Sequence, residues 1–253
     1  MTDRHGRFLW YELTTTDPDA ALAFYTSLVG WGTQVFEHPD MQYTMFTSND
    51  VPLAGVWGLT PDAGGPPNWV AYVGTDDLDG TVRRARESGA TVLADDQKIE
   101  GVGQFAMLAD PQGAVFALYQ PATDPGEETD PAPMEFSWHE LVTNDHPAAL
   151  RFYVDLFGWQ KISEFDMGEM GKYVLFGRGE RTYGGMFDTP PGMAEPPHWL
   201  LYVRVADLDA AVERVRDGGG QVLNGPMDVP GGDRIAQCMD PQGAAFALHE
   251  KRG

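Results

Sequence analysis

The chain carries the same sequence pattern twice, and this repeat limits what it can fold into. The segment Trp10–Trp31 returns 128 residues later as Trp138–Trp159, with Trp-x-Glu-Leu at its start and Gly-Trp at its end in both copies. Two further segments return at an offset of 130: Pro66–Asp79 as Pro196–Asp209, and Asp110–Leu118 as Asp240–Leu248. Repeats this long that keep the same order indicate two copies of one folded unit.

The length of the chain suits two domains of ordinary size. A total of 253 residues leaves roughly 120 residues for each copy, which is enough to bury a hydrophobic core. We expect domain 1 at residues 1–121 and domain 2 at residues 135–253. The segment 122–134 between them is rich in Pro, Asp, Glu and Thr, which is typical of an interdomain linker.

Composition disfavours several classes of function. The chain has 38 Asp and Glu against 17 Lys and Arg, a formal net charge of −21. The electrostatic field of this negative charge repels phosphate backbones and anionic lipids, so we expect neither nucleic acid nor membrane as a partner. No run of residues approaches the ~20 apolar residues of a membrane helix and no signal peptide is visible, so a cytoplasmic protein is expected. Cys238 is the only cysteine, which excludes an intrachain disulfide and predicts an inert, half-buried thiol on a strand.

Each copy is predicted to contain two modules with the same order of elements. The first module has a strand at 8–13, a helix that Asp17 caps and Gly30 ends, and strands at 32–36, 42–47 and 53–59. The second has a strand at 69–73, a helix at 78–88, and strands at 91–93, 104–109 and 114–119. The second copy repeats these modules at 136–188 and 198–250. The sequence therefore predicts an α+β protein built from four strand–helix–strand–strand–strand modules.

Modules of this order, met in pairs, resemble those of the vicinal oxygen chelate superfamily, which includes glyoxalase I, bleomycin-resistance proteins and extradiol dioxygenases. Two motifs carry the resemblance in both copies: Phe-Tyr…Leu-x-Gly-Trp at the end of a helix and Asp-Pro-x-Gly before a last strand. Trp-x-Glu-Leu, Pro-Pro-x-Trp and Asp-Pro-Gln-Gly-Ala resemble a tandem-repeat glyoxalase-like branch. The resemblance implies two tandem glyoxalase-like domains, each a pair of βαβββ modules that forms a cup-shaped sheet.

The resemblance also implies where the divalent metal of the metal-dependent members would be held. One His lies seven residues before the Asp that starts a module's helix, a second lies on the first strand of the even modules, and a Glu lies four residues after the glycine of the Asp-Pro-x-Gly turn. These positions are occupied here by apolar side chains: Trp10, Val70 and Ala117 in the first copy, and Trp138, Leu200 and Ala247 in the second. None of these side chains can coordinate a metal. We therefore expect no cofactor; the alternative is a divalent metal held at shifted positions.

Strand alternation predicts which side chains share the inner face of each cup. If Trp10 and Trp138 face inward, so do Glu12 and Glu140. The same step of two adds further candidates for ligand binding: Tyr72 and Tyr119 in the first copy, and His198, Tyr202 and His249 in the second. Glu12 and Glu140 are the candidate catalytic or recognition carboxylates, since burial among aromatic rings raises the pKa of a carboxyl group. The alternative is a carboxylate that only binds neighbouring backbone amides.

Other side chains are expected outside this inner face. Trp69 and Trp199 should face the helices and belong to the core, and His139 should point away from the cup. The two copies differ at the rim, where His198 and His249 stand in place of an Asn and a Tyr. The second copy is therefore the better candidate for acid–base chemistry or an improvised metal site.

Two main functions remain open. The first is a metal-free protein that binds a small aromatic or cationic molecule between aromatic walls and a carboxylate. The second is an enzyme of lyase, isomerase or oxygenase type that uses Glu12 or Glu140 with Tyr or His partners, or an atypical metal. A repeat scaffold with one degenerate half is a third possibility. Because the fused copies satisfy module pairing within one chain, we expect a monomer, with a homodimer as the alternative.

Overall fold

The computed structural model describes residues 4–38, 41–60, 65–190, 192 and 195–252. The order strand, helix, three strands occurs four times along these residues, as the sequence predicts. The first repeat contains β1 (Phe8–Thr15), α1 (Pro18–Val29), β2 (Gly32–His38), β3 (Met41–Ser48), β4 (Val51–Gly58), β5 (Asn68–Gly74), α2 (Leu78–Glu87), β6 (Thr91–Ile99), β7 (Gly103–Ala109) and β8 (Val115–Pro121). The second contains β9 (Phe136–Thr143), α3 (His146–Phe157), β10 (Gln160–Asp166), the 3-10 helix η1 (Gly168–Met170), β11 (Lys172–Arg178), β12 (Arg181–Asp188), β13 (His198–Arg204), α4 (Leu208–Asp217), β14 (Gln221–Asp228), β15 (Arg234–Met239) and β16 (Ala245–Glu250).

An aspartate caps the N-terminus of each of the four α-helices just named. The carboxylate of Asp17 accepts a hydrogen bond from the backbone N–H three residues later at 3.1 Å, and that of Asp145 does so at 2.9 Å. Asp77 and Asp207 cap α2 and α4 in the same way. Gly30 and Gly158 end α1 and α3 with φ of 87° and 70°, a left-handed conformation that favours glycine. The predicted limits of the first helix are confirmed.

The strands form two mixed sheets of eight strands each. The strand order is β2-β3-β4-β1-β5-β8-β7-β6 in one and β10-β11-β12-β9-β13-β16-β15-β14 in the other. Within each module the first strand pairs in parallel with the last, as in β1 with β4 and β13 with β16, whereas the hairpins are antiparallel. The predicted fold class, α+β with tandem domains of paired βαβββ modules, is confirmed.

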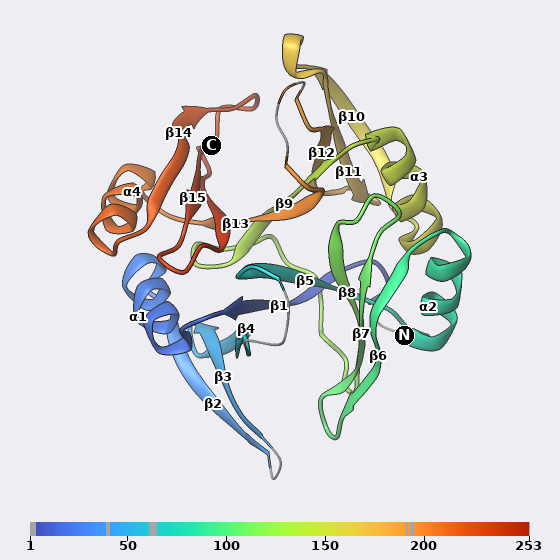
Figure 1. Ribbon diagram of the computed structural model, residues 1–253. Coiled ribbons are helices and arrows are strands. Elements are labelled where there is room, and N and C mark those ends of the chain that lie inside the picture. Colours follow the sequence, from blue (N-terminus) through green and yellow to red (C-terminus); the bar gives the residue numbers. More distant parts are fainter. Residues whose placement is uncertain (1–3, 39–40, 61–64, 191, 193–194, 253) are drawn as a thin grey trace. The chain divides into compact units, whose positions relative to one another are not determined.

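The chain also divides into two compact units, each of which contains segments of both repeats. Unit 1 comprises 1–10, 71–129 and 139–199, and unit 2 comprises 11–70, 130–138 and 200–253. Helices α2 and α3 contact each other in unit 1, and α1 and α4 contact each other in unit 2, where Figure 1 shows the blue helix beside the orange one. The boundaries predicted from the repeat, 1–121 and 135–253 with a linker at 122–134, stay a prediction.

A buried chain of hydrogen bonds joins the two repeats inside unit 2. The indole N–H of Trp69 donates to the Tyr25 hydroxyl at 2.9 Å, and that hydroxyl donates to Oδ2 of Asp240 at 3.1 Å. The other carboxylate oxygen of Asp240 accepts the backbone N–H groups of Gln242 and Ala244. Burial and the adjacent carboxylate raise the pKa of Tyr25 well above its usual value. The hydroxyl therefore stays protonated and keeps donating.

Unit 1 contains the matching series of hydrogen bonds, in which the tryptophan and tyrosine come from the second repeat and the aspartate from the first. Trp199 donates to the Tyr153 hydroxyl at 3.2 Å, and Tyr153 donates to Oδ2 of Asp110 at 3.0 Å. Burial raises the pKa of the Asp110 carboxyl, although hydrogen bonds from Ala114, Tyr153 and the turn amides oppose this shift. The repeated Phe-Tyr and Asp-Pro-Gln-Gly motifs thus meet each other across the repeats.

The predicted core tryptophans are buried, and side-chain contacts hold one residue of the expected linker. Trp69 and Trp199 are only 4% and 6% exposed, which confirms their assignment to the core. Glu128 of the expected linker accepts a hydrogen bond from the Tyr183 hydroxyl at 3.2 Å and lies 3.7 Å from the Arg181 guanidinium. Cys238 lies on β15 as predicted, but it is fully buried rather than half-buried, and burial raises its pKa to about 12. Its thiol is therefore inert, as expected.

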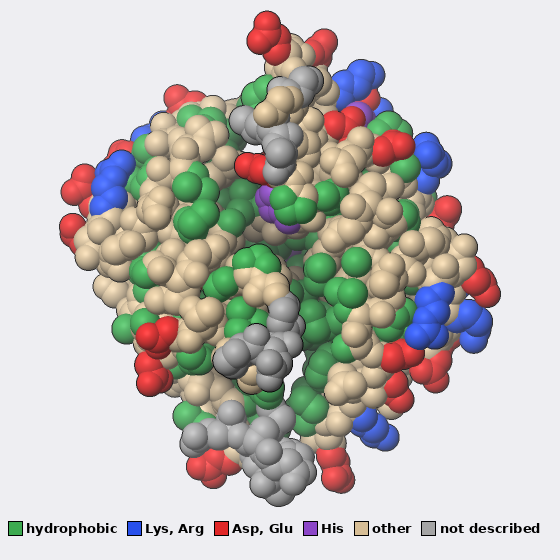
Figure 2. Space-filling view, viewed as in Figure 1, with side chains coloured by type: hydrophobic (Ala, Val, Ile, Leu, Met, Phe, Trp, Pro, Cys, Tyr) green, Lys and Arg blue, Asp and Glu red, His purple; other side chains and the backbone are tan. Residues whose placement is uncertain are grey.

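The surface agrees with the strongly negative charge. Asp and Glu side chains are scattered over the face shown in Figure 2, with fewer Lys and Arg between them. Among the described residues, no helix combines the length and the apolar character needed to cross a membrane.

We expect Tyr25→Phe and Tyr153→Phe each to lower the free energy of unfolding by about 1–3 kcal/mol, because each leaves a buried carboxylate and a buried indole N–H without the hydroxyl between them. Urea denaturation followed by tryptophan fluorescence measures the change. Tyr119→Phe, which removes a half-buried hydroxyl bonded to a single carbonyl, is the matched control with a smaller expected effect. An unchanged midpoint in both core variants would contradict a stabilising role for the chains.

Candidate functional site

In unit 2, Glu12 on β1 is held by a tyrosine from β3. The hydroxyl of Tyr43 donates a hydrogen bond to Oε2 of Glu12 at 2.8 Å. Between them lies β4, where Gly55 pairs with Glu12 in the parallel register of β1 and β4. Glu12 is half-buried. The hydroxyl of Tyr43 thus holds one oxygen of the Glu12 carboxylate in place.

Unit 1 contains the matching arrangement from the second repeat. Tyr173 on β11 donates to Oε2 of Glu140 on β9 at 2.8 Å, and Gly185 of β12 pairs with Glu140. Glu140 is only 6% exposed. A buried carboxylate costs free energy unless hydrogen bonds compensate for lost water, and the Tyr173 hydroxyl supplies one such bond.

Glycine at the middle position makes both contacts sterically feasible. A methyl group on Gly55 would overlap the ring of Tyr43, and one on Gly185 would overlap the ring of Tyr173. Any larger residue there would push the tyrosine away from its glutamate. The two glutamates are predicted from the sequence, whereas the two tyrosines and two glycines are not. All four positions repeat at the offset of 130, which was the available signal.

The other candidates of the first repeat gather around Tyr72 in unit 1. The Tyr72 ring lies edge-on to Phe105 and Tyr119, with ring centroids 5.9 and 6.4 Å apart. Tyr72 is buried, and the Tyr119 hydroxyl donates to the carbonyl of Val102 at 3.0 Å. Burial raises the pKa of Tyr119, so it stays neutral at physiological pH. Trp10, the remaining candidate of this copy in unit 1, is half-buried.

In unit 2 the three positions that the resemblance assigns to metal ligands in the second copy lie together, but as an apolar cluster. Leu200 and Ala247 are buried with Tyr202, and Trp138 packs against them. Tyr202 pairs with Ala247 across β13 and β16, and its hydroxyl accepts a hydrogen bond from the side chain of Gln237 at 3.2 Å. The convergence predicted from the resemblance is therefore present, whereas the donor atoms are not.

These residues do not fit a divalent ion. The converging side chains offer carbon where a metal needs nitrogen or oxygen. Within the described ranges, no group of three or more His, Cys, Asp and Glu is placed to hold a metal. The expectation that the chain uses no cofactor stays a prediction.

The two histidines predicted at the rim differ in their surroundings. The ring of His198 bonds the carbonyl of Pro196 at 2.9 Å, a local contact on the same segment. His249 on β16 instead links two side chains: its Nδ1 lies 2.8 Å from the Ser137 hydroxyl and its Nε2 lies 3.0 Å from Oδ2 of Asp233. Among the contacts of the described residues, His249 rather than His198 joins other polar side chains, and neither Ser137 nor Asp233 is predicted from the sequence.

His139 lies in the core of unit 1, which agrees with its predicted orientation away from Glu140. Its ring stacks on Phe8 with centroids 3.5 Å apart, and its Nδ1–H donates to the carbonyl of Tyr183 at 2.8 Å. Burial lowers the pKa of His139 to about 4, and the bond to Tyr183 only partly opposes this. The imidazole is therefore neutral at pH 7 and has a structural role.

We expect His139 to make the protein lose stability in mild acid. Because the folded state lowers its pKa from 6.5 to about 4, the unfolded state binds a proton first as the pH falls. The contribution is fully present above pH 6.5 and is lost between 6.5 and about 4, on the order of 3 kcal/mol. In the first repeat, Tyr11 stands at the position that matches His139. His139→Tyr should therefore be tolerated, and it should flatten this part of the curve of unfolding free energy against pH. Parallel curves for both proteins would contradict the assignment.

We expect Gly185→Ala to lower stability by about 1–3 kcal/mol, since the added methyl group displaces the Tyr173 ring from Glu140. The same change in a Tyr173→Ala background should cost clearly less, because no ring is left to overlap. A double-mutant cycle by urea denaturation measures this coupling. Equal costs in the two backgrounds would show that the glycine serves another purpose.

Comparison with known proteins identifies the family of both repeats. The family model described as Glyoxalase/Bleomycin resistance protein/Dioxygenase superfamily matches the chain twice, over residues 7–118 and 135–248. The protein named "Putative glyoxylase CFP32" of Mycobacterium tuberculosis is 34% identical over 250 residues, which span 97% of this chain and 95% of that protein. "Anthracycline biosynthesis protein DnrV" of Streptomyces peucetius is 33% identical over 262 residues, which span 98% and 94% of the two chains.

Solved structures share the fold at low sequence identity. The 2,3-dioxygenase LapB from Pseudomonas sp. KL28 has a TM-score of 0.70 at 13% identity, covering 99% of this chain and 94% of that one. The Mn(II)-bound glyoxalase from Novosphingobium aromaticivorans has a TM-score of 0.68 at 15% identity, covering 98% and 83%. At such identities the likeness concerns the fold alone. Because the family model matches most of both repeats, the chain belongs to the glyoxalase/bleomycin resistance protein/dioxygenase superfamily.

Proposed function

We propose that the chain binds a small planar aromatic or cationic molecule without a metal, on the strand faces that carry Glu12 and Glu140. The observation that carries the proposal is the repeated Glu–Tyr–Gly arrangement, in which a tyrosine fixes one carboxylate oxygen and a glycine makes room for its ring. A carboxylate held beside an aromatic ring attracts a cationic group, and the ring offers a flat apolar surface.

Two features support binding rather than metal chemistry. The positions that would hold a metal in the second copy are filled by Trp138, Leu200 and Ala247, which present an apolar surface. The formal net charge of −21 favours a cationic ligand over an anionic one. Binding by burial of an apolar ligand surface needs only such a wall and a few placed polar groups.

The names of two relatives point to the same class of ligand. DnrV of Streptomyces peucetius and DauV of Streptomyces sp. are both named anthracycline biosynthesis proteins, and each is 33% identical to this chain. Anthracyclines are flat polycyclic aromatic compounds. A planar aromatic molecule, with or without an amino group, is therefore the first class to test.

A second candidate function rests on the burial of Glu140. A buried carboxylate can act as a general base, with Tyr173 holding it in place, in lyase, isomerase or oxygenase-type chemistry. The other relative's name, "Putative glyoxylase CFP32", is consistent with an enzyme. Turnover of a bound ligand that disappears in Glu140→Gln, while binding persists, would favour this function over binding alone.

The binding proposal is tested with doxorubicin, a fluorescent anthracycline that is planar and cationic at neutral pH. We expect saturable quenching of its fluorescence, and an affinity at least about 10-fold weaker for the Glu12→Gln/Glu140→Gln double variant, which is about 1.4 kcal/mol. Glutamine keeps the shape of glutamate but removes its charge. The two single variants show which copy contributes.

Doxorubicinone, the neutral aglycone, separates charge from stacking. Its affinity should fall much less in the double variant, because it carries no ammonium group. Glu164→Gln, which alters an exposed glutamate bound by Lys161 and Lys172, is the charge-matched control for each single variant. If the double variant binds both ligands as tightly as the unaltered protein, the glutamates are not part of a binding site.

A further inference from the structure

Three side chains of unit 2 form a hydrogen-bonded chain that the proposed binding function does not use. Ser137 lies on β9, His249 on β16, and Asp233 in the connection between β14 and β15. The Ser137 hydroxyl lies 2.8 Å from Nδ1 of His249, and Nε2 of His249 lies 3.0 Å from Oδ2 of Asp233. The order is hydroxyl, imidazole, carboxylate, which is the order of a nucleophile, a base and an orienting acid.

The carboxylate determines which ring nitrogen of His249 carries the proton. Burial raises the pKa of Asp233, but the hydrogen bonds from the backbone N–H of Arg252 and from the His249 ring outweigh this effect. The pKa of Asp233 is therefore lowered overall, and the carboxyl group is ionised. An ionised carboxylate is only an acceptor, so Nε2 of His249 must be the donor. In that tautomer Nδ1 of His249 has the lone pair that can accept the hydroxyl hydrogen of Ser137. The alternative acceptor for Ser137, the Tyr202 carbonyl, is farther away at 3.5 Å.

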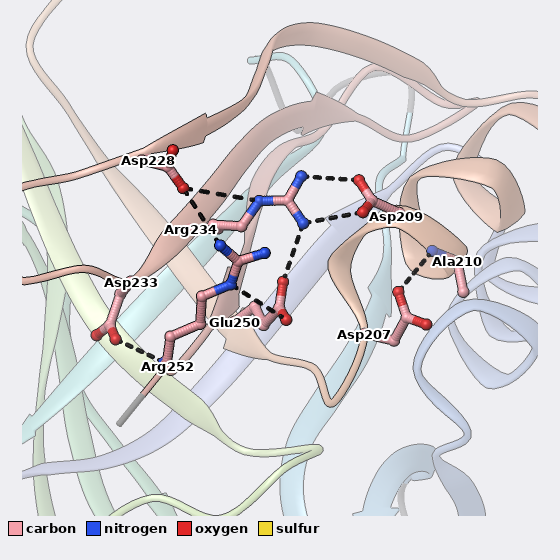
Figure 3. A network of polar contacts seen from close by, with 8 residues as sticks. All are labelled: Asp207, Asp209, Ala210, Asp228, Asp233, Arg234, Glu250 and Arg252. Atoms are coloured by element: carbon pink, nitrogen blue, oxygen red, sulfur yellow. Dashed lines mark hydrogen bonds and ion pairs between the residues drawn. The ribbon is translucent and has the colours of Figure 1, made fainter.

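Asp233 is itself held in position. Its Oδ1 accepts the backbone N–H of Arg252 at 2.8 Å, as Figure 3 shows. His249 lies opposite Ile235 in the antiparallel pairing of β15 and β16, and its side chain is 12% exposed. The base is thus fixed by two neighbours and shielded from most water, whereas Ser137 keeps partial exposure.

The fold does not need these three residues. The first repeat forms the same strands with Leu9, Gly103 and Tyr119 at the matching positions. Three polar residues that replace three unrelated ones, and that meet in space from three separate segments, are not explained by the scaffold. The arrangement belongs to the second repeat alone.

From this geometry we propose that Ser137, His249 and Asp233 form a nucleophilic serine site that hydrolyses small uncharged carboxylic esters. Ile235 lies opposite His249 and packs against the apolar cluster of unit 2, which favours an apolar acyl group. The net charge of −21 disfavours an anionic substrate and favours departure of the carboxylate product.

The reaction needs only water as co-reactant. The Ser137 oxygen attacks the ester carbonyl carbon while its proton passes to Nδ1 of His249. The carbon–oxygen bond to the alcohol then breaks, and the alcohol leaves with the proton from His249. Water attacks the acyl-serine, gives its proton to His249, and the carboxylic acid is released as Ser137 regains that proton. One ester and one water yield one acid and one alcohol.

Covalent labelling tests the proposal directly on the full chain. Diisopropyl fluorophosphate should add one phosphoryl group, visible by intact mass and mapped by peptide analysis to Ser137, and the protein should hydrolyse p-nitrophenyl butyrate. His249→Tyr introduces the residue that the first repeat has at the matching position, Tyr119, so we expect the variant to fold. It should slow both labelling and hydrolysis at least about 100-fold. Asp233→Asn should slow both as well, because the carboxylate no longer directs the imidazole.

Two variants separate this role from a structural one. Ser137→Ala should abolish labelling and turnover with a melting temperature close to that of the unaltered protein, whereas Ser27→Ala, an exposed serine of α1 in the same unit, should change neither. Absence of label on Ser137 in the unaltered protein would overturn the proposal. Labelling of Ser137 at an unchanged rate in His249→Tyr would also overturn it. Neither outcome bears on the glutamate-based binding tested with doxorubicin.

Discussion

The structure depends on two buried chains of hydrogen bonds, each running from a tryptophan through a tyrosine to an aspartate. Tyr25 binds Asp240, and Tyr153 binds Asp110, so each compact unit is closed by a residue from the other repeat. A phenol whose pKa is raised by burial cannot ionise near neutrality, and a buried carboxylate requires its donors. The same aspartate also fixes the Asp-Pro-Gln-Gly turn through backbone amides. One interaction therefore joins the repeats and shapes the turn before the last strand.

The two repeats have kept an arrangement of glutamate, tyrosine and glycine on corresponding strands. Each glutamate is held by a hydroxyl at 2.8 Å, and each glycine lies where a methyl group would displace the ring. In the second repeat, the positions that the superfamily resemblance assigns to metal ligands form an apolar cluster around Leu200. The held carboxylates and the apolar cluster are the two features on which the binding proposal rests.

The repeats differ where the second one gathers Ser137, His249 and Asp233. Sequence comparison within the chain singled out His249 because Tyr119 stands at the matching position, but it gave no reason to choose Ser137 or Asp233. These residues come from three separate segments, and only the packing of β9, β16 and the β14–β15 connection brings their polar atoms to 2.8 and 3.0 Å. A serine or an aspartate in isolation has no sequence signal, since both are common in turns and at strand ends.

The sequence by itself determined the repeat, the four βαβββ modules, the helix caps and the core positions of Trp69 and Trp199, because periodicity and capping are local properties of the chain. It also predicted that Glu12 and Glu140 lie on the inner strand faces, where a carboxylate needs hydrogen-bond partners. Only the tertiary structure decided that Tyr43 and Tyr173 bind these glutamates and that Cys238 is fully buried. It also decided that His198 bonds the nearby carbonyl of Pro196, whereas His249 contacts both Ser137 and Asp233. It also showed that each unit combines both repeats. Hydrogen-bond partners and burial arise from contacts between distant segments, and no local pattern encodes those contacts.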